Sequence, residues 1–250
     1  RYRLAPVKHA DETGWRIDGQ NGYTWLFATP ELSIFRCRDT RSARIVREVF
    51  GTRRLPGVLV VDRFAAYNAY PGRIQYCYAH LLRDLNDLAK EFPDNAEIRS
   101  FVEALAPLLA DAMHARALRI SDRRFRGQAA IIEREIRAII RRTANHPAVQ
   151  NYQDIFRDHD KRLFHWARDR RVPAENNLAE RDLRPLVIAR KVSFGSQSRN
   201  GAHTREVLMS VLHSLRKQTP EASARLKAAL DQLAQDPKTD LYQALFPQGP

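Results

Sequence analysis

Cysteine is scarce in this sequence of 250 residues, and long apolar runs are absent. Cys37 and Cys77 are too few for the disulfide framework of a small secreted domain. No stretch reaches the roughly 20 apolar residues of a membrane-spanning helix, and no secretory signal or lipidation motif is present. The sequence therefore predicts a cytoplasmic protein. The chain begins at Arg1 rather than at a methionine, which is typical of a piece of a longer protein.

Several catalytic signatures are also missing. Without a Gly-x-Ser-x-Gly elbow the sequence does not support a Ser-His-Asp hydrolase, and without a Gly-x-x-x-x-Gly-Lys-[Ser/Thr] loop it does not predict ATP use. Cys77 and His80 have the spacing of half a zinc site, but no second ligand pair accompanies them, so structural zinc is not expected. We expect Cys77 to be a buried residue on a strand and His80 to lie at the start of a helix.

Acidic residues are in the minority. The chain has 29 Asp and Glu against 42 Lys and Arg, which gives a net charge of +13 and a pI near 10.2. This excess indicates an anionic partner, with nucleic acid as the first candidate and a membrane surface as the alternative. Hydrophobic residues make up 44% of the chain, enough for a core in one large domain or a domain with an insertion.

The first third of the chain carries strand signals. Residues 7–10, 23–28 and 33–37 read as strands, and the Gly-Gln-Asn-Gly turn at 19–22 makes the first two antiparallel neighbours. Asp11 would directly follow the first strand. A helix over 41–50 is expected next, with Thr40 as its cap.

A buried strand, a helical middle and a late helix follow. The all-aliphatic run Val58–Val61 predicts a buried strand ending at Asp62, and residues 74–78 predict another short strand. Helical spacing of apolar residues dominates residues 79–170. A late helix over 202–217 is expected to turn Val207, Leu208, Val211, Leu212 and Leu215 inward. This order favours an α/β core interrupted by a helical insertion.

Carboxylates at strand ends are candidate metal ligands. The ends of neighbouring strands converge in α/β folds, so Asp11 and Asp62 could meet there. Two close carboxylates repel unless a cation lies between them, which is why such pairs bind Mg²⁺ or Mn²⁺. The alternative for each residue alone is plainer, because Asp62 could cap the turn after its strand and Asp11 could be a loop acid.

Glu180 is a third acid, on an expected helix. Asn176, Asn177 and Arg184 lie four before, three before and four after it, so all could share one helix face. A carboxylate among amides and a guanidinium suits metal binding beside a phosphate backbone. The alternative is a surface Glu180–Arg184 ion pair worth roughly 0.3–0.5 kcal/mol, and spacing alone does not separate the two.

Five segments, in order, resemble the catalytic domain of DDE transposases of the insertion-sequence family sixty-six type. They are ADETGW (10–15), GVLVVDRFAAYN (57–68), YCYAHLLRDL (76–85), ENNLAERDLRPLVIARKVSFGS (175–196) and GAHTREVLMSVL (201–212). The resemblance covers nearly the whole chain. Family members usually carry a DNA-recognition region before this domain, and nothing like it precedes Arg1, so we expect the catalytic portion only.

The resemblance implies an α/β fold with a ribonuclease-H-like mixed sheet and flanking helices, interrupted by an α-helical insertion. It assigns the catalytic and metal-binding acids to Asp11, Asp62 and Glu180, with Mg²⁺ or Mn²⁺ as cofactor. It also implies metal-dependent cleavage and strand transfer at transposon ends, by a homo-oligomer on DNA that accessory transposition proteins could assist. The expected location is the bacterial cytoplasm, at the nucleoid when bound to DNA. Glu175 and Asp182 are expected to be solvated or capping residues.

Basic and polar residues beside these acids are the expected DNA contacts. Residues 116–142 hold nine arginines against three acids and no compact recognition motif, so we expect phosphate contacts there. The basic, Ser- and Gly-containing segment after the Glu180 helix would grip the backbone, or else form a plain surface hairpin. The residues singled out are His80, Arg123, Arg124, Arg126, Asn177, Arg181, Arg184, Arg190 and Lys191.

The predicted organisation has four parts: residues 1–90 begin the catalytic core, 91–170 form the Arg-rich insertion, 171–220 end the core, and 221–250 form a C-terminal helix and tail. Two rival functions remain. One is an inactive or domesticated relative that only binds DNA, and the other is a basic helical scaffold for RNA. The presence of all three acids argues against the first, and the acid at the end of the Val58–Val61 strand argues against the second.

Overall fold

The computed structural model describes residues 2–247, and its contacts divide the chain into two compact units. The first unit combines Arg1–Gly51 with Asn177–Pro250, and the second is Thr52–Asn176. The four-part organisation expected from the sequence stays a prediction, and the last three residues of its 221–250 tail lie outside the described part.

The first unit contains an antiparallel group of strands. Strand β3 (Tyr23–Ala28) pairs with β1 (Val7–Gly14) on one side and with β4 (Ser33–Arg38) on the other. The predicted antiparallel neighbours are therefore confirmed. Asp11 does not follow β1 as expected, because the pairing continues past it to Gly14 and leaves Asp11 opposite Leu26. Acidic residues are uncommon in strands, so the sequence pattern predicted that this strand would end before Asp11.

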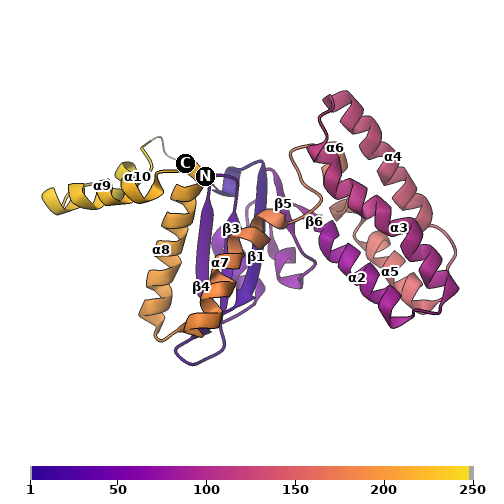
Figure 1. Ribbon diagram of the computed structural model, residues 1–250, viewed down its shortest axis with the longest axis horizontal. Helices are drawn as coiled ribbons and strands as arrows, with labels where there is room; N and C mark the ends of the chain where they lie inside the picture. Colours follow the sequence, from indigo (N-terminus) through magenta and orange to yellow (C-terminus); the bar gives the residue numbers. More distant parts are fainter. Residues whose placement is uncertain (1, 248–250) are drawn as a thin grey trace. The chain divides into compact units, whose positions relative to one another are not determined.

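Each face of this sheet is covered by helices or aromatic residues. On one face Leu26, Ala28 and Phe35 pack against α7 (Asn177–Ser193), which crosses the strands in Figure 1. On the other face Phe27 contacts the rings of Tyr2 and Phe50. Phe50 ends α1 (Ala43–Phe50), and Tyr2 begins the 3-10 helix η1 (Tyr2–Leu4). The N-cap of α1 is Ser42 rather than the predicted Thr40.

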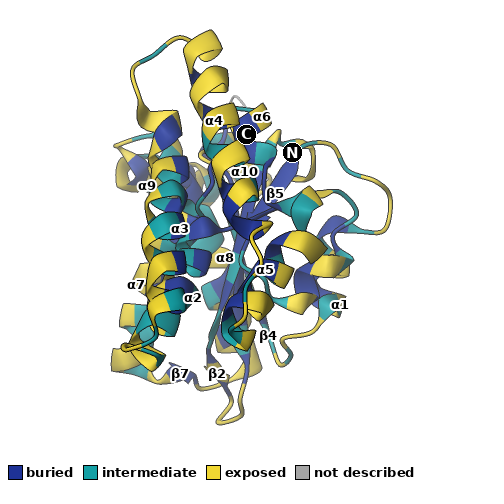
Figure 2. Cartoon of the chain, turned by 90° about the vertical axis from the view of Figure 1, so that its right-hand side faces the viewer, coloured by how far each residue is buried: buried dark blue, intermediate teal, exposed yellow. Residues whose placement is uncertain are grey.

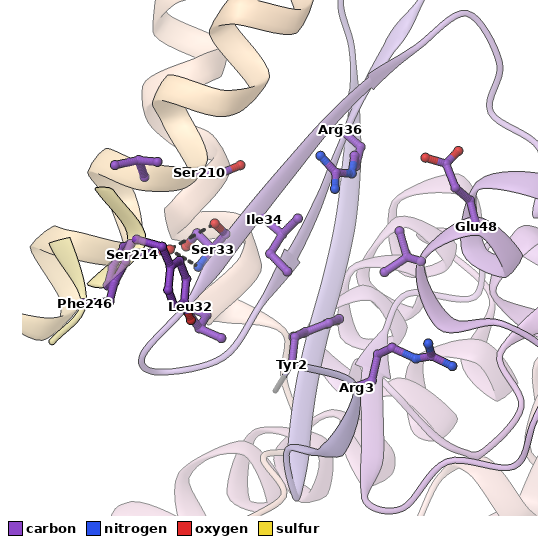
Figure 3. A pocket seen from close by; sticks show the side chains of 13 residues that line it. Tyr2, Arg3, Leu32, Ser33, Ile34, Arg36, Glu48, Ser210, Ser214 and Phe246 are labelled. Carbon is purple, nitrogen blue, oxygen red and sulfur yellow. Dashed lines mark hydrogen bonds between the residues drawn. The ribbon is translucent and has the colours of Figure 1, made fainter. Parts of the chain in front are cut away.

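Helix α8 (Arg199–Gln218) covers the outward side of β4 with polar side chains. Alternate backbone N–H groups of β4 donate to one stripe of α8. These bonds run from Cys37 to Glu206, Phe35 to Ser210 and Ser33 to Ser214, over 2.8, 2.9 and 3.1 Å. Figure 3 shows Ser214 beside Ser33, along a pocket of about 500 Å³ at this edge. The stripe satisfies donors that an uncovered edge strand would expose to other chains.

This polar stripe overturns part of the predicted burial in α8. Leu215 is buried as expected, but it packs with Val211 against α9 (Ala222–Gln235) and α10 (Leu241–Leu245) rather than against the sheet. Val207 and Leu208 are 45% and 52% exposed, so their predicted inward orientation is wrong. The side of α8 that faces the sheet carries acceptors for the backbone N–H groups of β4. A pattern of hydrophobic residues does not show that such acceptors are needed.

The second unit pairs a two-stranded parallel group with a set of helices. Strand β5 (Val58–Val61) is buried throughout, as predicted, and pairs with β6 (Arg73–Tyr76). Its helical segments are η2 (Ala65–Ala69), α2 (Tyr78–Glu91), α3 (Ala96–His114), η3 (Ala115–Ala117), α4 (Asp122–Ile140), α5 (Pro147–Asp158), η4 (Asp160–Arg162) and α6 (His165–Arg168). Cys77 is buried as predicted, but it is the N-cap residue of α2 rather than part of a strand.

The predicted α/β class with a mixed sheet and flanking helices is confirmed, and the ribonuclease-H-like character of the sheet stays a prediction. Strands β4, β3 and β1 come from the first unit, and β5 and β6 from the second. The short strands β2 (Arg16–Ile17) and β7 (Gly195–Ser196) form a separate parallel pair. Within residues 2–247, no helix is both long enough and apolar enough to cross a membrane.

Candidate functional site

Asp11 lies on the face of the sheet that α7 covers. It is paired across the strands with Leu26, and directly paired residues project to the same side. Leu26 packs with Ala179 and Leu183 of α7 in one cluster. The Asp11 side chain is half-buried, and its Oδ1 accepts the Glu12 backbone N–H at 2.8 Å. Glu12 projects to the opposite face and pairs there with Arg41.

Glu180 is in the first turn of that same helix. Ala179 and Leu183 face the sheet, so Glu180 lies at the flank of the buried face and is itself half-buried. A carboxylate in a first turn is stabilised by the positive end of the helix dipole. The first unit therefore brings two of the three predicted acids, Asp11 and Glu180, to the same side of its strands.

The simple ion pair proposed as an alternative for Glu180 is not formed. Arg184 is exposed and makes no ion pair with any residue of the described chain, 2–247. Asp182, also on α7, has a cationic partner in Lys217. It is buried, accepts a hydrogen bond from Ser33 Oγ at 2.9 Å, and pairs with Lys217 at 2.5 Å. The prediction that Asp182 is solvated is wrong, because this pair anchors α7 to α8.

Asp62 directly follows the buried strand β5 and is half-buried. Its Oδ1 accepts the Phe64 N–H at 2.9 Å, which is the turn-capping role considered from the sequence. No ion pair joins Asp62 to any residue in 2–247, and its neighbour Arg63 pairs with Asp84 instead. A carboxylate that lacks a cationic partner in so basic a chain retains capacity to bind a cation.

The donor set fits a hard divalent cation. Mg²⁺ and Mn²⁺ prefer carboxylate oxygens, and Asp11, Asp62 and Glu180 offer only such oxygens. All three residues are half-buried. The convergence of Asp62 with the other two acids stays a prediction.

The structure also defines the surroundings of Cys77 and of Glu175. Cys77 Sγ accepts the backbone N–H of Asn176 at 3.2 Å, which ties the start of α2 to the segment before α7. Glu175 is half-buried, so the solvated alternative predicted for it is wrong, whereas the capping alternative stays a prediction. Burial raises the pKa of its carboxyl, and the charges of Arg116 and His114 act in the opposite direction.

Most arginines of the 116–142 segment form no ion pair with an acid of residues 2–247. Arg137 alone forms ion pairs with described residues, to Glu133 and Asp160. Arg123, Arg124 and Arg126 are exposed in the first turns of α4, whose outer surface is exposed in Figure 2. Their charges are therefore available to an external anion.

The other residues predicted to contact DNA differ in their exposure and in the hydrogen bonds that they make within the protein. Asn177, Arg181 and Lys191 are exposed on α7, and His80 is half-buried in the first turn of α2. Arg190 already donates through Nη1 to Thr13 Oγ1 at 3.0 Å and to the Gly14 carbonyl at 2.6 Å. Arg190 thus fastens α7 to the end of β1, and only its other N–H groups remain for a phosphate.

Sequence reasoning missed the role of Glu206. This residue is 3% exposed and accepts hydrogen bonds from Arg36 at 2.6 Å and Arg38 at 2.9 Å. It also accepts the Cys37 N–H of the edge strand. The usable signal was the spacing of Ala202, Glu206, Ser210 and Ser214, a stripe of small or polar residues every four positions along one helix face.

Replacing Glu206 with alanine is expected to lower the free energy of unfolding by about 2 kcal/mol, because a buried backbone N–H loses its acceptor. The two arginines stay partly hydrated, so the larger cost of an isolated buried charge does not apply. Urea unfolding measures the change. Asp231→Ala removes an exposed ion pair with Lys227 and serves as the control, with an expected cost of about 0.3–0.5 kcal/mol. Equal effects of the two variants would contradict the role of Glu206.

Comparison with known proteins identifies the family. The family model described as "Transposase IS66 family" matches residues 1–204. The chain belongs to the IS66 transposase family. All three candidate acids and every candidate DNA contact lie inside the matched range, whereas α9 and α10 lie beyond it.

One curated relative of this IS66-family chain is "Uncharacterized protein y4jD" of Sinorhizobium fredii (strain NBRC 101917 / NGR234). It is 24% identical over 227 residues, which cover 84% of this chain and 43% of that protein. The chain therefore spans less than half the length of this relative.

Among solved structures, the catalytic core domain of HTLV-2 integrase in complex with magnesium matches in two forms. The dimeric form has a TM-score of 0.23 and 9% identity, covering 46% of this chain and 90% of that one. The trimeric form has a TM-score of 0.22 and 10% identity, covering 48% and 90%.

Proposed function

We propose that this chain is the catalytic portion of a DNA transposase that cleaves phosphodiester bonds and transfers strands at transposon ends. The observation that carries the proposal is the state of Asp62. Its carboxylate follows a fully buried strand, remains partly exposed, and has no ion pair among residues 2–247 although the chain holds 42 basic residues. Membership of the IS66 transposase family supports DNA as the substrate.

In the proposed mechanism, Asp11, Asp62 and Glu180 hold divalent metal through their carboxylate oxygens. When bound, Mg²⁺ or Mn²⁺ lowers the pKa of a coordinated water and stabilises the leaving oxygen of the phosphodiester. The phosphate chain is held by exposed cations of α7, Arg181 and Arg184, which have no ion pair of their own among residues 2–247.

The proposed assembly is a homo-oligomer on DNA. Strand transfer joins two transposon ends to a target, and more than one catalytic centre serves that reaction naturally. Accessory transposition proteins are proposed as further partners. Both proposals concern the whole protein. This chain matches only 43% of the length of its curated relative.

A nicking assay on supercoiled plasmid tests the proposed activity. The purified chain is incubated with Mg²⁺, with Mn²⁺, with Ca²⁺, or with a chelator, and open-circular product is quantified on a gel. Nicking with Mg²⁺ or Mn²⁺ and none with chelator is the expected result. Binding of plasmid without metal-dependent nicking would favour an inactive DNA-binding relative instead. Absence of both binding and nicking would overturn the proposal.

A further inference from the structure

Phe194 is an exposed aromatic residue in a strained backbone conformation. It directly follows α7, its side chain is 74% exposed, and its φ is 57°. Its N–H donates to the Arg190 carbonyl at 2.9 Å, which closes the end of the helix. Glycine or asparagine is preferred at such a left-handed helix end, and a bulky side chain is disfavoured there. The ring gains little packing within the chain in return for this strain.

The backbone on both sides of Phe194 is held in place. Gly195, at φ 142°, pairs with Arg16, and a Cβ at this glycine would lie 2.3 Å from the Arg16 carbonyl oxygen. Ser196 Oγ accepts the indole N–H of Trp15 at 3.0 Å. On the helix side, Arg190 is bonded to Gly14. The ring is thus presented outward from a fixed position and not from a loose loop.

The surroundings of this ring are basic and apolar. Residues 183–205 contain five basic residues and no acidic one. Lys191 and Arg199 are exposed close to Phe194 in the chain, and Val192, two residues before it, is 78% exposed. A second copy of this surface would bring like charges together, which opposes self-association here. A ligand that matches this basic and apolar surface is negatively charged and offers flat apolar faces. Unpaired bases on a phosphate backbone are such a ligand.

We propose that Phe194 stacks on an unpaired base of bound DNA while Lys191 and Arg199 neutralise the adjacent phosphates. This role rests on the proposed function, since it names the part of the DNA that this surface takes. Stacking on an aromatic ring tolerates any base, because every base has a π-face. A rigidly presented ring loses little conformational freedom on binding, which explains why a strained position is useful here.

The test compares two DNA probes that share one duplex. One is blunt, and the other has a single-stranded 3′ overhang containing 2-aminopurine, whose fluorescence reports stacking. Phe194→Ala should bind the overhang probe about tenfold more weakly than the unaltered chain and leave the fluorescence of its 2-aminopurine unquenched. Binding of the blunt duplex should be unchanged. Phe194→Trp should restore both overhang affinity and quenching.

Two further variants separate stacking from folding and from general apolar contact. Phe194→Gly removes the ring and also relieves the backbone strain, so it should fold at least as well as the unaltered chain and still lose overhang binding. Val192→Ala shortens a neighbouring exposed apolar side chain and should leave both probes unaffected.

Equal loss on the blunt and overhang probes, or no loss on either, would overturn the stacking role. If Phe194→Ala instead turned a dimer into a monomer on size exclusion, the ring would belong to a protein interface and the proposal would be wrong. Failure of the unaltered chain to bind either probe would overturn the proposed function itself. Normal duplex binding without any dependence on Phe194 would overturn only this inference.

Discussion

Replacing Asp62 with asparagine is expected to abolish metal-dependent DNA cleavage and to leave DNA binding intact or slightly tighter. Asparagine keeps the oxygen that accepts the Phe64 N–H, so the turn after β5 survives. It removes the negative charge that a divalent ion needs, and it lessens repulsion of phosphate. A loss of at least about 10³-fold in nicking rate is expected, equivalent to about 4 kcal/mol of transition-state stabilisation.

The control for this variant is Asp94→Asn, an exposed acid of the same unit for which no role is proposed. It should nick plasmid at the unaltered rate. DNA affinity is measured in parallel with chelator present, so that a binding defect is not mistaken for a catalytic one. Cleavage by Asp62→Asn at the rate of the unaltered chain would show that Asp62 is not a metal ligand.

Replacing Arg123, Arg124 and Arg126 together with alanine is expected to weaken DNA binding about equally on unrelated sequences. These arginines are exposed, and none forms an ion pair within residues 2–247. Each phosphate contact contributes about −0.9 to the slope of log affinity against log salt. Loss of three contacts would make the slope shallower by about 2.7. A salt titration on two unrelated duplexes measures this change.

The matched control removes arginines from the same unit that already have partners. Arg157 pairs with Asp154 and Arg171 with Asp169, so alanine at these positions removes charge that is locally compensated. This double variant should change the slope much less than the triple variant does. An unchanged slope in the triple variant would place the DNA along Arg181, Arg184 and Lys191 instead. A loss confined to one duplex would mean that the α4 arginines read base sequence.

Most strands, and the acidic and basic residue types of the candidate site, could be predicted from local sequence patterns. The aliphatic run of β5 and the alternation in β4 predicted those strands because burial on both faces, or on one, leaves a direct trace in the sequence. The basic composition indicated a polyanionic partner, because the net charge of a chain follows from its composition and does not depend on how it folds. The position of Asp11 within β1 was missed, since pairing with β3 overrides the weak strand preference of acidic residues.

Which acid keeps its charge available was decided only by tertiary structure. Asp62 and Asp182 look alike in the sequence, each beside an arginine, yet Asp182 is buried against Lys217 and Asp62 has no such partner in residues 2–247. The partner lies 35 positions along the chain and meets Asp182 only because α8 packs beside β4. Likewise α8 turns Glu206 inward because backbone donors of an edge strand require acceptors, and that requirement exists only once the sheet has formed.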